Sequence, residues 1–237
     1  MVRSEEVGTK LLIWDFDGTL GYREGGMWAA ALVEVIREAD PGLPVTEAEL
    51  RPYLQSSFPW QNPDVPHPEL VPGEVWWRAL EPVFQGALQG VGLPPGRVRQ
   101  MTARVRYLYA EPGRWRLFDD VVPALEELST KGWVHALLSN HVPELRAIVQ
   151  QLGLMPYLSG FFNSAETGYE KPHPAAYRAV LTAYGHPAVV WMIGDSYGVD
   201  VAGAGQVGIQ GILVRRSDPR ADRYCPGLAQ VVGIVGC

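Results

Sequence analysis

Short apolar runs recur along the chain, with stretches of helical periodicity between them. The strongest runs cover residues 11–14, 133–138, 189–193 and 211–214, and a weaker one covers residues 161–162. They are rich in aliphatic or aromatic residues and are bounded by Gly, Asp or Asn. This pattern is typical of strands that are buried on both faces of a parallel sheet.

Helical spacing of apolar residues fills the gaps between these runs. It covers residues 121–130, 143–152 and 174–184. A proline lies at or near the first turn of each stretch, where proline is tolerated in a helix. The alternation of strands and helices predicts an α/β fold built on a doubly wound parallel sheet.

The region from residue 22 to residue 114 has a different pattern, with helical spacing but no convincing strand. Its helical stretches cover residues 27–38, 74–84 and 97–109, and residues 56–73 are rich in proline. We therefore expect residues 22–114 to form a helical insert after the first strand. Residues 1–21 and 115–237 would then form the α/β core.

Composition and charge narrow the classes of partner. The 237 residues are 47% hydrophobic and 19% charged, with a net charge of −6, which is ordinary for a globular chain with a real core. An acidic chain argues against nucleic acid and anionic membranes as partners, because both favour a basic face. No apolar run has the length of a membrane span.

The cysteines and the N-terminus indicate the compartment. Cys225 and Cys237 are the two cysteines, and their spacing fits neither a disulfide framework nor a zinc site. The N-terminal residues are polar and carry acidic side chains, unlike a signal peptide. We therefore expect a cytoplasmic protein.

Polar residues follow the predicted strands at the edge where parallel α/β sheets bind ligands. The segment Asp15-Phe16-Asp17-Gly18-Thr19 follows the first run, and Ser139-Asn140 follows the second. Gly194-Asp195-Ser196 ends the run at 189–193, with Asp200 five residues after Asp195. Glu170-Lys171-Pro172 precedes a predicted helix. Taken singly, each has a structural explanation: a turn, a helix cap or a solvated lysine.

Together, these four positions favour a functional site. Asp15 and Asp17 are two residues apart, so an extended backbone directs both side chains to one side, with Cα atoms roughly 6.6 Å apart. Carboxylates this close repel each other, and a divalent cation or a shared proton relieves the repulsion. The order of all four positions at strand and helix ends makes coincidence a poor explanation.

The order and spacing of these positions resemble the four motifs of the haloacid dehalogenase (HAD) superfamily. Residues 15–19 resemble the first motif, Ser139 the second, Lys171 the third, and Asp195 with Asp200 the fourth. The helical insert is similar to the C1 cap of that family. These motifs are specific for the superfamily but not for a substrate.

The resemblance implies a magnesium-dependent phosphohydrolase in which Asp15 is transiently phosphorylated. Asp17 would protonate the leaving alcohol and later activate water. Asp15, Asp195 and the backbone carbonyl of Asp17 would bind Mg²⁺, and Asp200 would support the metal directly or through water.

The resemblance also implies how the phosphate is held. Lys171 would offset the charge between Asp15 and the phosphoryl oxygens. Ser139 and the backbone N–H groups near Asn140, Gly18 and Thr19 would hold the other oxygens, as helix N-termini and turns do for anions.

A helical lid over the strand ends favours a small phosphorylated metabolite as substrate, because closure excludes water and large molecules. A phosphomutase keeps both carboxylates and stays open as an alternative. A 2-haloacid dehalogenase is disfavoured because those enzymes resemble DxYGT where this chain has Asp17. A non-catalytic binding protein of this fold is disfavoured because the acidic residues and Lys171 are all present. The oligomeric state is unknown.

Several other residues have two interpretations each. The formal GxGxxG pattern at residues 203–208 does not directly follow a strand, so we expect a helix and its cap there and no dinucleotide site. His141 either contacts substrate at a pocket rim or is exposed in the first turn of a helix. The candidates for the pocket mouth or for selecting the leaving group are Tyr22, Arg23, Arg51, Trp60, His67 and Arg114.

Overall fold

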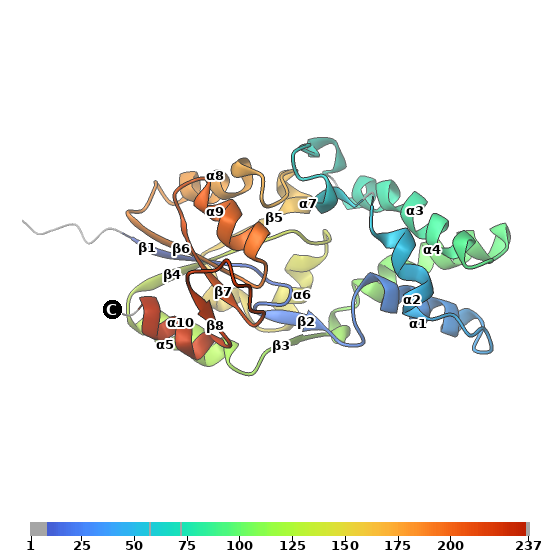
Figure 1. Ribbon diagram of the computed structural model, residues 1–237, viewed down its shortest axis with the longest axis horizontal. Coiled ribbons are helices and arrows are strands. Elements are labelled where there is room, and N and C mark those ends of the chain that lie inside the picture. The colour runs from blue at the N-terminus through green and yellow to red at the C-terminus, as the bar shows by residue number, and fades with distance from the viewer. Residues whose placement is uncertain (1–8, 57, 72, 236–237) are drawn as a thin grey trace, which may run out of the picture.

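A six-stranded parallel sheet forms the core of the computed structural model, which describes residues 9–56, 58–71 and 73–235 (Figure 1). The strand order is β5-β4-β1-β6-β7-β8. The strands are β1 (Lys10–Trp14), β4 (Trp133–Ser139), β5 (Gly160–Asn163), β6 (Val189–Gly194), β7 (Gln210–Val214) and β8 (Tyr224–Cys225). Every predicted run is confirmed as a strand, including the weaker one.

Helices cover both faces of this sheet (Figure 1). The core helices are α5 (Val121–Thr130), α6 (Leu145–Gln151), α7 (Ser164–Thr167), α8 (Pro174–Ala183), α9 (Gly203–Gly205) and α10 (Leu228–Val235). Leu12 and Trp14 of β1 pack into one apolar cluster, and Leu11 and Ile13 pack into another. A strand buried on both faces is what a doubly wound sheet requires, and this fold class is confirmed.

The insert consists of helices and short turns. Its α-helices are α1 (Trp28–Ala39), α2 (Glu47–Leu50), α3 (Gly73–Gly90) and α4 (Pro95–Tyr109). The 3-10 turns are η1 (Arg51–Leu54), η2 (Pro59–Gln61), η3 (Pro68–Leu70) and η4 (Pro112–Arg114), with η5 (Met155–Tyr157) in the core. The element η6 (Tyr197–Ala202) is a π-helix after β6.

A two-stranded antiparallel ribbon connects the insert to the core. It pairs β2 (Gly21–Arg23) with β3 (Trp115–Leu117). The expectation of no strand after residue 22 is therefore wrong at its first two residues, because three-residue strands are too short to show alternation. The division into core and insert stays a prediction, since one apolar cluster runs from Trp14 through Leu20 into the insert helices.

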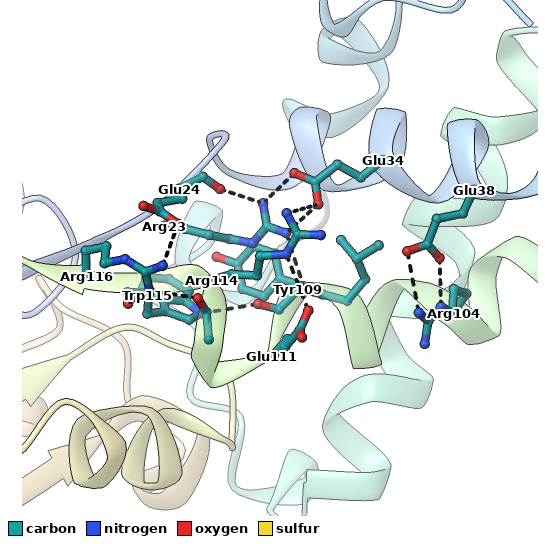
Figure 2. A network of polar contacts seen from close by, with 12 residues as sticks. Arg23, Glu24, Glu34, Glu38, Arg104, Tyr109, Glu111, Arg114, Trp115 and Arg116 are labelled. Carbon is teal, nitrogen blue, oxygen red and sulfur yellow. Dashed lines mark hydrogen bonds and ion pairs between the residues drawn. The ribbon is translucent and has the colours of Figure 1, made fainter. Parts of the chain in front are cut away.

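A network of charged side chains lies at the root of the insert (Figure 2). Arg23, only 3% exposed, donates to Glu34 Oε2 on α1 at 3.0 Å and to the carbonyls of Gly26 and Leu108 at 2.8 and 3.3 Å. Further ion pairs join Arg114 to Glu34, Arg116 to Glu24 and Arg104 to Glu38. Arg23 therefore anchors helices and does not line a pocket mouth, while the Tyr22 ring packs against Phe118 at a tilt of 46°.

The opposite side of the insert contacts the core through Glu144, the residue before α6. Its carboxylate accepts hydrogen bonds from Trp77 Nε1 at 2.9 and 3.1 Å and from Arg106 Nε at 2.9 Å. The backbone N–H of His67 donates to the Gly168 carbonyl at 2.7 Å. The insert is thus held to the core at a second place, away from the ribbon.

Few structural facts bear on the expectation of a cytoplasmic protein. Within the described ranges, no helix combines the length and the apolar character that crossing a membrane needs. Cys225 is a buried free thiol in β8. Cys237 and residues 1–8, on which the expectation about a signal peptide depends, lie outside the described residues.

Candidate active site

Asp15 lies at the middle of the sheet edge because β1 lies between β4 and β6. Trp14 pairs with Leu137 on one side and with Ile193 on the other. The next residue, Asp15, therefore emerges level with the last residues of both neighbours, and its N–H donates to the Ile193 carbonyl at 2.9 Å. Parallel register is what brings the separated motifs to one point.

Lys171 and Ser139 both contact the Asp15 carboxylate. Lys171 Nζ lies 2.8 Å from Asp15 Oδ1, and Ser139 Oγ donates to the same oxygen at 3.1 Å. The ammonium of Lys171 also lies 2.6 Å from Asp200 Oδ1. Lys171 is 1% exposed, so it is not the solvated lysine that its local sequence suggests. These contacts bring residues of all four sequence motifs together around the Asp15 carboxylate and the Lys171 ammonium.

Asn140 has a role that the sequence did not reveal. Its side chain donates to the Lys171 carbonyl at 2.7 Å and accepts from the Lys171 N–H, also at 2.7 Å. This two-way amide contact fixes the loop that carries Lys171. No spacing signal links residues 31 positions apart, so only the fold could reveal the pair.

Two glycines allow the acidic side chains to approach each other. Gly18 has a φ of +78°, and a Cβ atom there would lie 2.5 Å from Asp195 Oδ2. A Cβ atom at Gly194 would overlap the Asp200 carboxylate. Both positions therefore exclude larger residues on steric grounds.

The turn after Asp15 uses the N–H groups that were predicted to hold phosphate. Gly18 N–H donates to the Gly21 carbonyl at 2.8 Å, and Thr19 N–H donates to the Phe16 carbonyl at 3.2 Å. Thr19 is fully buried. Phosphate binding by Gly18 and Thr19 stays a prediction, and their observed role is to shape the turn.

Three carboxylates form a candidate metal centre. Asp15, Asp195 and Asp200 each offer an oxygen, and these oxygens lie within 4.8 Å of one another. An all-oxygen set of carboxylates suits a hard divalent cation such as Mg²⁺. Asp200 differs from the other two because both of its oxygens already have a hydrogen-bond donor, Lys171 Nζ for one and the Ser196 N–H for the other.

The pKa values of the acidic residues are raised by burial and by one another's negative charge. Loss of hydration, then the charges of Asp15 and Asp195, raise the pKa of Asp17 to about 8. Burial and Asp15 also raise the pKa of Asp195. Burial raises the pKa of Asp200 to about 6 despite the Lys171 ammonium. A bound divalent cation would favour the ionised forms of Asp195 and Asp200, whose carboxylates belong to the candidate metal centre.

Asp17 is set apart from the other acidic residues and faces a cavity of about 270 Å³. The core and the insert both line this cavity, through Asp17, Met27, Trp28, Trp60, Tyr109, Asn140, His141, Val142 and Val199. His141 is 4% exposed, so the expectation of an exposed residue is wrong. Arg51, His67 and Arg114 are not among the residues lining it.

Sequence reasoning missed several of these lining residues. Trp28 and Tyr109 lie in amphipathic helices, where aromatic side chains predict packing as well as binding. The residues of the GxGxxG pattern lie elsewhere: Gly203–Gly205 form α9, and Gly208 ends it with a φ of +81°. That arrangement agrees with a helix cap and not with a dinucleotide site.

Comparison with known proteins identifies relatives of this chain. Residues 9–208 match the model of the haloacid dehalogenase-like hydrolases. A phosphoserine phosphatase of Thermus thermophilus is 34% identical over 60% of this chain and 58% of its own length. The human haloacid dehalogenase-like hydrolase domain-containing protein 3 is 26% identical over 96% of this chain and 94% of its own length.

Solved structures share the fold at lower identity. The magnesium-bound HAD-hydrolase YfnB of Bacillus subtilis has a TM-score of 0.70 and 17% identity, and covers 97% of this chain and 100% of its own. The L-2-haloacid dehalogenase of Xanthobacter autotrophicus has a TM-score of 0.68 and 21% identity, with 96% and 98% covered. The family match extends over most of the chain and includes all four motifs. This chain therefore belongs to the haloacid dehalogenase-like hydrolase family.

Proposed function

We propose that this hydrolase is a magnesium-dependent phosphatase that acts on a small phosphorylated metabolite through an aspartyl-phosphate on Asp15. One observation carries the proposal: a single Asp15 oxygen accepts from both Lys171 and Ser139, beside the oxygens of Asp195 and Asp200. Relatives named as phosphatases of phosphoserine and of ribulose 1,5-bisphosphate support phosphoryl chemistry.

The contacts of Asp15 suit it for nucleophilic attack. Lys171 and Ser139 fix the direction of its carboxylate. An Asp15 oxygen forms a bond to phosphorus while the bond from phosphorus to the leaving alcohol breaks. The ammonium of Lys171 offsets charge on both the carboxylate and the phosphoryl oxygens. Gly18, Thr19 and the backbone of Asn140 would complete the phosphate site.

Asp15, Asp195 and the Asp17 carbonyl would hold Mg²⁺, and Asp200 would support it from further out. The reason for separating Asp200 is that both of its oxygens already have partners, Lys171 and Ser196. When bound, Mg²⁺ supplies the positive charge that lets a carboxylate approach an anionic phosphate. The raised pKa values of Asp195 and Asp200 fit a site that binds such a cation.

Asp17 is the proposed acid and base. Its pKa of about 8 leaves it protonated near neutral pH in the metal-free protein, and it faces the cavity beside the reacting centre. Its proton passes to the leaving oxygen in the first step. The resulting carboxylate then takes a proton from the water that attacks phosphorus, which regenerates Asp15.

The test is a panel of phosphate esters with and without Mg²⁺, assayed on wild type and Asp15→Asn. We expect Mg²⁺-dependent phosphate release by wild type, and rapid acid quench should trap a phosphoryl group on Asp15. Asp64→Asn, at an exposed position of the insert, is the matched control and should match wild type. Activity on 2-chloropropionate without metal, or full turnover by Asp15→Asn, would overturn the proposal.

A further inference from the structure

The cavity beside Asp17 differs in chemistry from the charged site next to it. Among the described residues that line it there is no lysine or arginine. Asp17 is the only acidic side chain in that set, and its pKa is raised. An anionic group placed in this cavity would lose its hydration without gaining a counter-charge, which is costly.

Flat aromatic rings form the wall that the insert contributes. Trp28 stacks on Tyr109 with ring centroids 3.7 Å apart and an interplanar angle of 3°. Trp60 lies nearly parallel to Trp28 at 6.0 Å and is stacked on Phe58 at 4.6 Å. Trp28 and Trp60 are both partly exposed, so their remaining surface is available to a ligand. Parallel rigid rings favour a planar partner.

His141 supplies an unused polar group from the core side. The residue is 96% buried, and neither ring nitrogen has a partner with good hydrogen-bond geometry, although the Val142 backbone lies near enough to act on its pKa. Its ring is packed against Phe16 at 5.6 Å and Trp115 at 4.8 Å. A buried imidazole with both nitrogens unsatisfied is unfavourable unless a ligand or an ordered water completes it. Burial lowers the pKa of His141 to about 3, so the ring is neutral, with one donor and one acceptor.

We infer that this cavity holds the leaving group of the substrate, and that this group is a compact, uncharged, ring-bearing alcohol hydrogen-bonded to His141. The inference rests on the proposed function and adds its substrate class. The volume of about 270 Å³ suits one small ring system. Phosphoserine and bisphosphates, each carrying a second anionic group, fit this cavity poorly.

A quaternary ammonium group is the main competitor for an aromatic wall. It would leave the His141 nitrogens without a partner, because it neither donates nor accepts a conventional hydrogen bond. One face of Trp28 is also already covered by Tyr109. The neutral ring is therefore the better occupant, and choline phosphate enters the test as the competing ligand.

The first experiment compares kcat/KM with Mg²⁺ for phosphate monoesters of alcohols with sp³ carbinol carbons, so that the leaving groups stay comparable. The ring-bearing esters are benzyl phosphate and the 3- and 4-hydroxybenzyl phosphates. The others are phosphoserine, 2-phosphoglycolate and choline phosphate. We expect kcat/KM for the better of the two hydroxybenzyl phosphates to exceed that for phosphoserine, 2-phosphoglycolate and choline phosphate by about 100-fold. Equal or faster turnover of the charged esters would overturn the inference and leave the phosphatase proposal standing. No turnover of any ester would contradict the phosphatase proposal itself.

The second experiment uses variants that separate binding from packing. His141→Phe keeps the ring contacts and removes both nitrogens, so the hydroxybenzyl-to-benzyl ratio of kcat/KM should fall about tenfold, with Tm unchanged or raised. His141→Gln should keep more of that ratio. Trp60→Leu should lower the preference for ring-bearing esters over 2-phosphoglycolate, and Tyr107→Leu, at a side chain 67% exposed, is the control. An unchanged ratio in His141→Phe, or a lower Tm with all esters equally slowed, would contradict the assignment.

Discussion

Two buried cations differ in the number of carboxylates around them. Lys171 lies at the strand ends, and Arg23 lies at the root of the insert. Arg23 donates to one carboxylate, Glu34, and to three backbone carbonyls, so both terminal nitrogens of its guanidinium have acceptors (Figure 2). Lys171 contacts the carboxylates of Asp15 and Asp200 together, with two further acidic residues close by.

This difference separates a structural network from a chemical one. Around Arg23, charge is matched and helices are fixed to the ribbon. Around Lys171, burial and then the neighbouring carboxylates raise the pKa values of Asp17 and Asp195. Uncompensated buried carboxylates are destabilising, and strongly shifted groups gather at functional sites. Buried carboxylates in excess of their counter-charges therefore mark the place where we propose that a cation and a phosphoryl group bind.

The largest expected effect is on the nucleophile. Asp15→Asn should lower kcat on the order of 10⁴-fold or more, because the attacking oxygen is lost. Glu34→Gln should leave kcat unchanged and lower stability by roughly 1–3 kcal/mol, because Arg23 loses its charged acceptor. Steady-state kinetics and thermal unfolding on the same preparations check both. A loss of kcat in Glu34→Gln comparable to that in Asp15→Asn would remove the distinction between the two regions.

A smaller effect is expected at the acid. Asp17→Asn should slow release of an alkyl alcohol by about 10²–10⁴-fold, since the leaving oxygen no longer receives a proton. Release of 4-nitrophenol should be slowed much less, because that leaving group departs without protonation. Single-turnover assays of both esters measure the first step. An equal slowing of both would show that Asp17 is not the acid.

The raised pKa values of the buried acidic residues also predict how pH and metal affect stability. The pKa values of Asp17 (about 8) and Asp200 (about 6) are raised in the folded state, whereas the unfolded chain ionises near pH 4. The folded state thus holds more protons, and this stability is lost as pH rises through the folded pKa values. Metal-free Tm should therefore fall between pH 5 and pH 8.

Saturating Mg²⁺ should oppose that loss. A cation that binds only the folded state stabilises it by about 2.7 kcal/mol at 100 times its Kd, so the gain in Tm should be larger at pH 8 than at pH 5. Asp17→Asn should flatten the pH dependence in EDTA, and Glu34→Gln should not. A metal-free Tm that rises from pH 5 to pH 8 would contradict this account of the site.

The smallest expected effect concerns the contacts between insert and core. Glu144→Gln weakens the hydrogen bonds from Trp77 and Arg106, and partly exposed pairs of this kind contribute about 1 kcal/mol or less. We expect KM to rise about threefold with kcat little changed. Glu74→Gln is the control, because Glu74 pairs with Arg106 within the insert. A large fall in kcat for Glu144→Gln would instead place this contact in the chemical step.

The sequence predicted the strands that show an apolar run and the motif residues that have a fixed order and spacing. Apolar runs gave the five longer strands of the sheet, and the motif residues after them lie at its edge as expected. The two-residue β8 and the three-residue β2 and β3 carry too few residues for a pattern. Their formation depends on pairing with neighbours that only the folded chain supplies.

The motif residues of the site were predictable, whereas the contacts made by Asn140 and the neutral residues of the cavity were not. Asp15 and Lys171 follow a known order of motifs, whereas the Asn140 contact with the Lys171 backbone joins distant segments. The burial of His141 beside Asp17 likewise depends on the insert folding over the strand ends. Helical spacing predicts that Trp28 and Tyr109 lie on the packed face of a helix, but it does not predict that this face borders a cavity.

The stereochemical course at phosphorus tests the central claim most directly. A substrate ester with an isotopically chiral phosphoryl group would be turned over in labelled water, and the configuration of the released inorganic phosphate would be determined. Attack by Asp15 followed by attack of water inverts phosphorus twice, so retention of configuration is predicted. Inversion would mean that water attacks the ester directly and that Asp15 is not the nucleophile.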